Sequence, residues 1–439
     1  MSAKRDLPRR YEVTIDRLSH EGRGVGRYLG KTVFVADALP GELVVAQVAR
    51  RHRRYDEAVA VEFLKTDPAR VTPRCPHAAI CGGCSLQHLE PATQIAHKQQ
   101  VLLEHLQHQA GVTPEQVLEP ILGPLWGYRR RARLSVRFVP KKGGVLIGFR
   151  EKATAYVTAI DVCAVLVPSV GERLPALRAM VNSLSIPEHI PQIEIAADDN
   201  TTVLVLRHLQ AFSPSDLEIL VGFEVETGLK IYLQAGSLAS LVPVAAGAAL
   251  AYHVDGFTFA FQPGDFVQVN ADINRALVHA AVDALSPTTT DSVLDLFCGL
   301  GNFTLPLARR AGQVVGVENE QGLVERARDN AARNGLTNVE FIRADLFRAD
   351  ELGALSARPF TKILLDPPRS GAELLLRAIS LRGVTRLVYI SCNPVTLARD
   401  TAILVRERGL RLQAAGVIDM FPHTAHVESL AVFEPGNGG

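Results

Sequence analysis

The sequence predicts a multidomain α/β protein with a small N-terminal β-barrel, a central α+β domain and a C-terminal Rossmann-like domain. A chain of 439 residues exceeds what one hydrophobic core usually organises. Its first part is rich in short β-type segments, whereas after Asn270 buried strands alternate with helices. We therefore expect domains over residues 1–66, 67–264 and 265–439.

The N-terminal domain is predicted as a barrel because short β-type segments follow one another with turn residues between them. These segments are residues 11–15, 31–35, 42–48 and 58–61. The residues that separate them are Gly22, Gly24, Gly26, Gly30, Pro40 and Gly41.

The central region begins with a linker over residues 66–74, which contains Pro68 and Pro73. Residues 91 to about 108 have helical composition and few breakers. From about residue 125 to residue 261 the chain is strand-rich again, most clearly at 134–139 and 202–206. This mixture predicts an α+β domain.

The C-terminal region alternates apolar runs with helical segments, as βα units of a parallel sheet do. The predicted strands are residues 293–297, 314–317, 339–342, 363–365 and 387–390. In such sheets, ligands gather beyond the carboxyl ends of the strands. Side chains that follow these runs are therefore the candidates for chemistry.

Composition indicates an ordinary globular protein, with 47% apolar and 21% charged residues. No apolar run reaches the length of a membrane span. The segment Met1–Asp6 is polar and lacks the apolar core of a secretion signal. We expect a cytoplasmic protein, in which clustered cysteines indicate metal binding or catalysis rather than disulfides.

The net charge of +1 averages over an uneven distribution. Basic residues cluster at 50–54 and again at 129–133, and Arg137, Lys141, Lys142 and Arg150 follow the second cluster. Such clusters can be solvated faces. Two of them in the N-terminal half of a near-neutral chain favour contact with phosphates, so a nucleic acid is the expected partner.

A glycine turn follows the first strand of the C-terminal domain, where Gly299 and Gly301 allow the backbone to approach a ligand. Thr304 stands where a third glycine would complete a dinucleotide motif, which weakens that interpretation. Glu318 ends the next strand and can accept from ribose hydroxyls, and Asp345 ends the third and can contact an adenine edge. This combination suits S-adenosylmethionine.

The sequence Asp366-Pro367-Pro368-Arg369 follows the fourth strand. A plain turn explains it by local chemistry alone. Beside a cofactor site it is expected to line the reaction centre. Similar sequences accompany methylation of amino groups on bases, so these residues do not distinguish methylation at nitrogen from methylation at carbon.

Cys392 follows the fifth strand, and most lone cysteines are small buried hydrophobes. The alternative is nucleophilic catalysis: a thiolate that adds to carbon 6 of uracil makes carbon 5 able to attack a methyl sulfonium. A base must then remove the carbon 5 proton. Glu428 is the candidate, although an exposed carboxylate at a strand edge is the plainer interpretation of that residue.

Together these residues resemble the RNA (uracil-5-)-methyltransferases that use S-adenosylmethionine. The resemblance extends over Phe261–Asn270, Asp295–Phe303, Asp366–Arg369, Ser391–Pro394 and His423–Glu428. It implies Cys392 as nucleophile and Glu428 as base. It implies cofactor contacts from Gln268, Phe297, Asn302, Glu318, Asp345 and Asp366. It also implies that Phe266 packs on the target base.

Three cysteines are spaced Cys75-x5-Cys81-x2-Cys84, and Cys163 is the only other cysteine before the methylation domain. Four thiolates suit structural zinc or an iron–sulfur cluster, and His77 could also be a zinc ligand. Zinc sites more often pair two CxxC knuckles, so chemistry alone favours iron–sulfur only modestly. The resemblance implies a structural [4Fe–4S] cluster, which the ribosomal branch of the family carries on this pattern.

The first 65 residues resemble a TRAM domain, a small RNA-binding barrel. The TRAM domain and the iron–sulfur cluster together imply an enzyme that methylates a uridine in 23S ribosomal RNA. The target uridine would be splayed or flipped out of its stack into the site. We expect a monomer that binds no DNA and no membrane. The alternatives are an enzyme for transfer RNA or a second ribosomal uridine, and a non-catalytic iron–sulfur RNA-binding protein. The last should have lost Cys392 or Glu428. A TRAM-bearing methylthiotransferase disagrees with the cysteine spacing.

Overall fold

The computed structural model describes residues 9–237 and 240–436, so the segment Met1–Asp6 considered above lies outside the described residues. Contacts divide the chain into two compact units. The first comprises residues 1–100, 150–156 and 421–426, and the second comprises residues 101–149, 157–420 and 427–439. The domain boundaries expected at residues 66 and 264 stay predictions.

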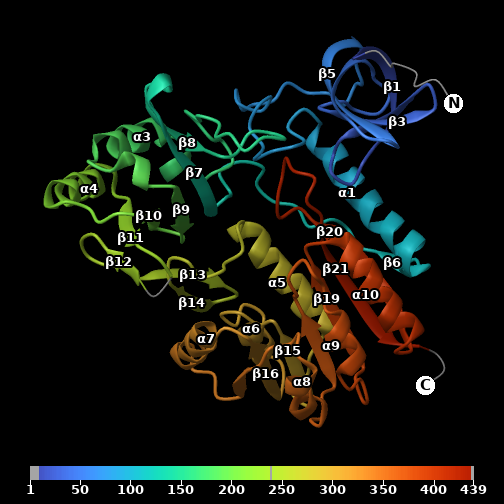
Figure 1. The fold of residues 1–439 in the computed structure, drawn as a ribbon. Helices are drawn as coiled ribbons and strands as arrows, with labels where there is room; N and C mark the ends of the chain where they lie inside the picture. The colour runs from blue at the N-terminus through green and yellow to red at the C-terminus, as the bar shows by residue number, and fades with distance from the viewer. Residues whose placement is uncertain (1–8, 238–239, 437–439) are drawn as a thin grey trace. The chain divides into compact units, whose positions relative to one another are not determined.

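The first unit contains a closed barrel with strand order β1-β2-β3-β5-β4, which confirms the predicted N-terminal fold (Figure 1). Its strands are β1 (Arg10–Leu18), β2 (Gly24–Tyr28), β3 (Lys31–Ala36), β4 (Leu43–Arg51) and β5 (Tyr55–Lys65). Strand β2 was not expected, because its glycines had been assigned to turns. A Cβ on Gly26 would lie 2.3 Å from the Thr14 carbonyl oxygen, so glycine is needed there for β1 and β2 to pair.

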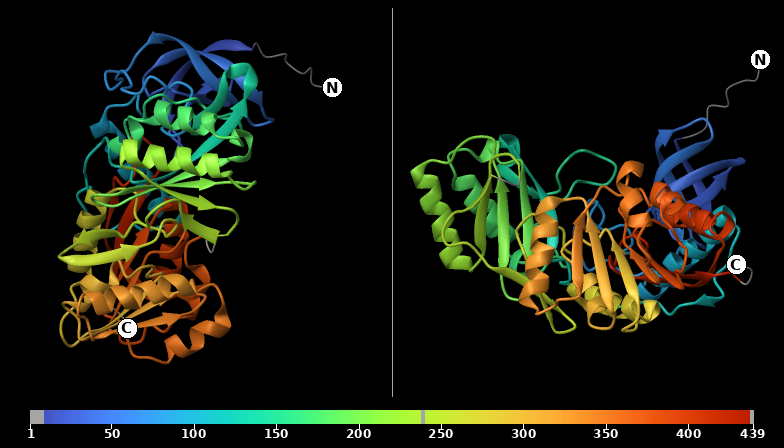
Figure 2. Two further views of the ribbon diagram at one scale, coloured as in Figure 1. Left: turned by 90° about the vertical axis from the view of Figure 1, so that its left-hand side faces the viewer. Right: turned by 90° about the horizontal axis from the view of Figure 1, so that it is seen from below.

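The second unit holds a six-stranded sheet of order β12-β11-β10-β9-β7-β8. The strands are β7 (Arg131–Val139), β8 (Gly144–Gly148), β9 (Gln192–Ala197), β10 (Thr202–Arg207), β11 (Lys230–Gln234) and β12 (Leu241–Pro243). Helices α3 (Leu174–Ser183) and α4 (Pro214–Thr227) lie together on one side of this sheet (Figure 2). This arrangement agrees with the predicted α+β character.

The second unit also holds the eight-stranded sheet β17-β16-β15-β18-β19-β21-β20-β6. The strands are β6 (Gln116–Val117), β15 (Ser292–Leu296), β16 (Gln313–Glu318), β17 (Val339–Arg343), β18 (Lys362–Leu365), β19 (Arg386–Ser391), β20 (Leu410–Ile418) and β21 (Glu428–Pro435). Strands β15 to β19 are parallel, as predicted. Strand β21 runs antiparallel between β19 and β20, so the complete sheet is mixed.

Helices accompany this sheet. They are α5 (Ala271–Leu285), α6 (Thr304–Ala308), α7 (Gln321–Arg333), α8 (Ala349–Ser356), α9 (Glu373–Ala378) and α10 (Pro394–Arg406). Helix α5 packs against β18, β19 and β21, and α10 packs against β20. The remaining elements are α1 (Pro91–His105), the π-helix η1 (Leu106–Ala110), α2 (Pro168–Gly171), the 3-10 helices η2 (Pro140–Lys142) and η3 (Pro187–His189), and the hairpin β13 (Leu250–Val254) with β14 (Phe257–Phe261).

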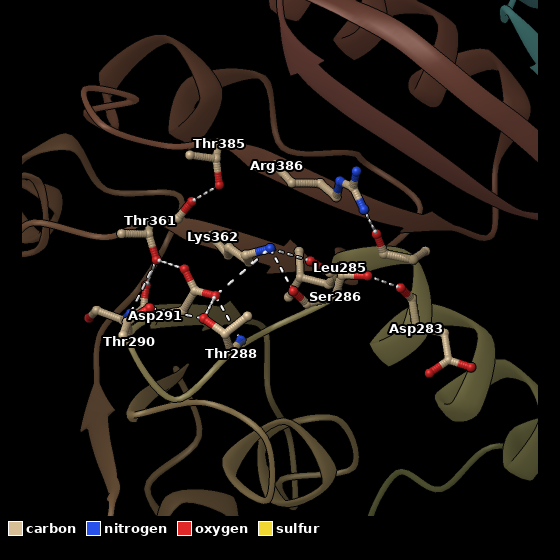
Figure 3. A network of polar contacts seen from close by, with 12 residues as sticks. Asp283, Leu285, Ser286, Thr288, Thr290, Asp291, Thr361, Lys362, Thr385 and Arg386 are labelled. Carbon is tan, nitrogen blue, oxygen red and sulfur yellow. Dashed lines mark hydrogen bonds and ion pairs between the residues drawn. The ribbon is translucent and has the colours of Figure 1, made fainter.

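A network of hydrogen bonds and ion pairs joins the amino-terminal ends of β15, β18 and β19 to the end of α5 (Figure 3). The Lys362 ammonium donates to the carbonyl oxygens of Leu285 (2.8 Å) and Ser286 (2.7 Å). Arg386 donates to the Ala284 carbonyl oxygen at 3.0 Å. This end of the sheet is therefore stabilised by charged side chains.

None of the described helices has both the length and the apolar character that crossing a membrane requires.

Candidate active site

The predicted site residues meet at one edge of the eight-stranded sheet. Phe297, Asp366 and Cys392 directly follow the parallel strands β15, β18 and β19, and Glu318 ends β16. Strand β21 runs the opposite way and pairs Ser429 with Ser391. Its first residue, Glu428, therefore lies at the same edge. The strand order changes direction between β15 and β18, the position at which open α/β sheets bind ligands.

The turn after β15 has a backbone that only particular residues tolerate. Gly299 (φ 55°) and Gly301 (φ 89°) lie in the left-handed region, and so does Phe297 (φ 64°). A Cβ on Gly301 would lie 2.6 Å from a methyl carbon of Leu305 on α6. Glycine thus allows the turn to pack on the helix that follows it. The strained Phe297 backbone is typical of a functional position.

Glu318 has its carboxylate oriented by three backbone amides. One oxygen accepts from the Gly299 amide at 3.2 Å, and the other accepts from the amides of Asn319 (2.8 Å) and Glu320 (3.0 Å). The carboxylate consequently bridges the glycine turn and the end of β16. Its remaining lone pairs can accept hydroxyl hydrogens, as predicted for a ribose.

Gln268 and Asn302 are each held by contacts. The Gln268 carbonyl oxygen accepts from Arg130 Nε at 2.8 Å, and its side chain is half-buried. The Asn302 carboxamide pairs with that of Asn274 and also accepts from the Tyr252 hydroxyl at 3.0 Å. Asn274 and Tyr252 were missed by the sequence interpretation, and Arg130 was noted only as part of a basic cluster.

Asp345 lies two residues beyond the end of β17, not at the last position of the strand as predicted. Its backbone amide donates to Glu351 Oε2 at 2.7 Å, and one of its carboxylate oxygens accepts from the Phe347 amide at 2.9 Å. The Phe347 ring lies 5.7 Å from the Phe297 ring, centroid to centroid. The exposed Phe347 ring can stack on a purine. Phe347 was also missed.

Two aspartates at this edge carry raised pKa values. Burial raises the pKa of Asp366 to about 7. Burial also raises the pKa of Asp295 to about 7, and the charges of Asp366 and Glu318 add to that rise, while a hydrogen bond from the Thr304 hydroxyl opposes it. Asp295 is fully buried, and its Oδ1 has no hydrogen-bond partner among the described residues. Perturbed pKa values of this kind cluster at functional sites.

Cys392 lies between the end of β19 and the beginning of α10, and is half-buried. The Asn393 side chain caps α10 by accepting from the Val395 amide at 3.1 Å. Burial raises the pKa of the Cys392 thiol to about 12, and the nearby charges of Glu428 and Asp366 contribute, while Arg369 opposes them. Burial and these negative charges therefore favour the protonated form of the thiol.

Hydrogen bonds connect the segment Asp366–Ala372 to α10 and hold its residues beside Cys392. The Arg369 carbonyl oxygen accepts from the Asn393 side chain (3.1 Å) and from the Thr396 hydroxyl (3.2 Å). Asp400 is fully buried and accepts from the Ala372 amide at 2.7 Å. These contacts agree with an active-site loop better than with a plain surface turn.

Phe266 has an exposed side chain (59%), and the Arg131 guanidinium carbon lies 5.5 Å from its ring centroid. An exposed aromatic ring beside a cation can stack on a nucleobase. This arrangement is compatible with the predicted contact to the target base.

The four cysteines predicted as metal ligands are divided between the two units. Cys75, Cys81 and Cys84 belong to the first unit and Cys163 to the second. Cys81 and Cys163 are buried, the other two are half-buried, and none of the four forms a disulfide. The Gly83 amide donates to Cys81 Sγ at 3.4 Å. Across the residues that the structure describes, no three His, Cys, Asp or Glu side chains are placed to hold a metal ion. The ligand set stays a prediction.

Comparison with known proteins identifies two regions of the chain. Residues 247–434 match the model of the family described as tRNA (Uracil-5-)-methyltransferase, and residues 7–61 match the TRAM domain. The first match contains the complete edge described above, from Gln268 to Glu428. The second match covers the strands of the closed barrel up to the middle of β5.

Relatives match nearly the whole length of the chain. Proteins named 23S rRNA (uracil(1939)-C(5))-methyltransferase RlmD are 52% identical over 436 residues in Alkalilimnicola ehrlichii (98% of each chain) and 50% identical over 429 residues in Hahella chejuensis (96% of each chain). The crystal structure of Pyrococcus abyssi tRNA (uracil-54, C5)-methyltransferase with S-adenosyl-L-homocysteine is 25% identical, with a TM-score of 0.74 over 96% of this chain and 99% of that one. The predicted fold class is thereby confirmed. The chain belongs to the RNA (uracil-5-)-methyltransferase family, within the group of relatives named RlmD.

Proposed function

We propose that this protein methylates carbon 5 of a uridine in 23S ribosomal RNA with S-adenosylmethionine as methyl donor. The observation that carries the proposal is the meeting of a thiol, a carboxylate and a glycine turn at one sheet edge, in a chain about half identical to proteins named for this reaction. The solved relative with S-adenosyl-L-homocysteine supports the choice of methyl donor.

In the proposed reaction, Cys392 loses its proton to solvent and the thiolate sulfur adds to carbon 6 of the uracil, which makes carbon 5 nucleophilic. S-adenosylmethionine supplies the electrophilic methyl group, which is transferred to carbon 5. Glu428 then removes the carbon 5 proton, and the carbon 6–sulfur bond breaks to restore the ring and release the Cys392 thiolate, which takes up a proton from solvent. The adjacency of Glu428 and Cys392 that this sequence requires is supported by the electrostatic influence of the carboxylate on the thiol.

The raised pKa of Cys392 has a consequence for the order of events. Burial and the charges of Glu428 and Asp366 keep the thiol protonated without ligands. A sulfonium cation bound at this edge offsets those negative charges and lowers the cost of forming a thiolate. We infer that the methyl donor binds before Cys392 becomes reactive.

Trapping with fluorinated RNA tests the chemistry. Fluorine at carbon 5 cannot be removed as a proton, so a 23S fragment containing 5-fluorouridine should remain bonded to Cys392 in the presence of S-adenosylmethionine. The adduct should survive denaturing electrophoresis, and peptide mapping should place it on Cys392. An active preparation that never yields this adduct would sink the proposed mechanism.

The choice of RNA needs its own test, because the matching family model and the solved relative are both named for transfer RNA. The protein should be incubated with labelled S-adenosylmethionine and either 23S ribosomal RNA or transfer RNA. We expect label in the 23S transcript at one uridine, located by mass mapping. Label in transfer RNA alone would establish the alternative.

We further propose that Cys75, Cys81, Cys84 and Cys163 hold a structural [4Fe–4S] cluster. Four thiol ligands and an amide that donates to Cys81 Sγ are typical partners of such a cluster. After anaerobic purification, the protein should contain iron and sulfide and absorb in the visible range. Cys81→Ser should lose the iron, whereas Cys298→Ser, which removes a buried thiol outside this set, should keep it. Unchanged iron in Cys81→Ser would contradict the ligand set.

A further inference from the structure

Asn302, at the end of the glycine turn, has nearly all its hydrogen-bonding capacity occupied. Its oxygen accepts from Asn274 Nδ2 and from the Tyr252 hydroxyl, both at 3.0 Å, and its nitrogen donates to Asn274 Oδ1 at 3.0 Å. A carboxamide has two acceptor sites and two donor hydrogens. Among the described residues, one N–H of Asn302 is therefore left without an acceptor and can donate to a ligand.

The pair of carboxamides alone does not fix which way Asn302 points. If Asn302 and Asn274 were both flipped, their two reciprocal hydrogen bonds would form again with donors and acceptors exchanged. The Tyr252 hydroxyl removes this degeneracy, because a phenol is a better donor than acceptor and therefore favours the Asn302 oxygen on its side. Burial raises the pKa of Tyr252, so the hydroxyl keeps its hydrogen.

Tyr252 is itself held rigidly. It is buried on β13, its ring stacks on that of Phe259 at 4.9 Å between centroids with an angle of 8° between planes, and the Arg130 guanidinium carbon lies 4.8 Å from its centroid. Arg130 also donates to the Gln268 carbonyl oxygen at 2.8 Å. The same arginine thus contacts both segments from which cofactor contacts are expected, Gln268 directly and Asn302 through Tyr252.

We infer that Tyr252 is a positioning residue for the methyl donor, which orients the Asn302 carboxamide so that its free N–H faces the bound cofactor. This inference rests on the proposed use of S-adenosylmethionine. It assigns a role in cofactor binding to a residue on the hairpin that precedes the methyltransferase sheet. Tyr252 itself need not touch the cofactor, since its effect passes through one hydrogen bond.

The test is Tyr252→Phe in the full-length protein, which removes the hydroxyl and keeps the ring between Phe259 and Arg130. We expect the Kd of S-adenosyl-L-homocysteine, measured by calorimetry, to rise about three- to tenfold, as loss of one neutral hydrogen bond implies. The KM for S-adenosylmethionine should rise equally, while kcat at saturating cofactor stays within about twofold because the reacting atoms are unchanged.

The chain offers a matched control in Tyr232 on β11. It is buried as well, in the six-stranded sheet, and its hydroxyl accepts from the amide of Ala248, which lies between β12 and β13, at 2.7 Å. Tyr232→Phe loses a comparable hydrogen bond and should leave the Kd unchanged. Equal Kd changes in the two variants would overturn the inference, because the effect would then be a general loss of packing.

Asn302→Ala provides the second check. If Tyr252 acts through Asn302, adding Tyr252→Phe to Asn302→Ala should cause no further loss of affinity, whereas additive losses would contradict the inference. Wild-type protein that does not bind S-adenosyl-L-homocysteine at all would instead refute the proposed cofactor. The two failures are therefore distinguishable.

Discussion

Negative side chains are stabilised at one end of the methyltransferase sheet and destabilised at the other. At the amino ends of the strands, Asp291 accepts from the hydroxyls of Thr361 (2.8 Å) and Thr288 (2.9 Å) and lies 3.9 Å from the Lys362 ammonium (Figure 3). Burial alone would raise the pKa of Asp291, but these contacts outweigh it and the pKa is lowered. The carboxylate is thus more stable in the folded chain than in the unfolded one.

At the carboxyl ends the balance is reversed. Asp295 has one hydroxyl donor, from Thr304, and one buried oxygen without a partner among the described residues. Burial raises the pKa values of Asp295 and Asp366 to about 7 and that of Cys392 to about 12. Folding therefore brings together groups whose charged forms the protein does not stabilise.

This difference separates the part of the sheet that stabilises the fold from the part that works on a ligand. A fully partnered network adds stability, whereas negative groups held without enough donors cost stability and are retained where a ligand completes them. In the proposed function, that ligand carries a positive charge. Substitutions at the carboxyl ends and at the amino ends of the strands should therefore have different effects.

The largest effect is expected for Cys392→Ala at the carboxyl end. Removing the nucleophile should lower turnover by at least about 10⁴-fold, as loss of a covalent catalyst does. The Kd of S-adenosyl-L-homocysteine and the urea midpoint should stay near those of the wild type, because the side chain makes no network contact at the amino end. Residual turnover within about tenfold of wild type would show that the thiol is not the nucleophile.

At the amino end, Lys362→Met should lower the free energy of unfolding by about 3 kcal/mol, because it leaves Asp291 and two carbonyl oxygens without their buried cation. Urea denaturation measures this loss. The Kd of S-adenosyl-L-homocysteine should not change, since the substitution lies at the opposite end. Arg382→Met, which removes an exposed cation, serves as control. A large change in Kd would break the division between the two ends.

Asp295→Asn tests the cost of the unpartnered carboxylate. The pKa of Asp295 is about 7 in the folded chain, well above its value in the unfolded chain. As the pH rises, Asp295 therefore loses its proton in the unfolded chain first. Stability should consequently fall between about pH 4 and pH 7 and then level off. The asparagine variant should lack this contribution and be more stable above pH 7 by on the order of 2 kcal/mol. Thermal unfolding of both proteins across this pH range measures the difference. The same pH dependence of stability in both proteins would contradict the raised pKa of Asp295.

The sequence predicted the edge of the site because apolar runs mark strands, and the residues after those runs must gather where parallel strands end. It could not show that Asp295, inside a predicted buried strand, would have one carboxylate oxygen without a partner among the described residues. It also could not place β21 between β19 and β20, which brings Glu428 to Cys392. The hydrogen bond between Tyr252 and Asn302 was equally invisible, since only folding brings residues 50 positions apart together.

The smallest predicted effect distinguishes charged from neutral hydrogen bonds within the amino-end network. Thr288→Ala removes a donor to the Asp291 carboxylate, so it should cost about 1 kcal/mol at pH 7. That cost should shrink as the pH falls below 4, because the lowered pKa of Asp291 makes its contribution disappear on protonation.

Thr385→Ala removes a donor to the Thr361 carbonyl oxygen in the same network. Its cost should be the same at both pH values, because no charge is involved. Urea denaturation of the two variants at pH 7 and pH 3 makes the comparison, and equal pH dependence would show that the Thr288 hydroxyl does not stabilise the Asp291 charge.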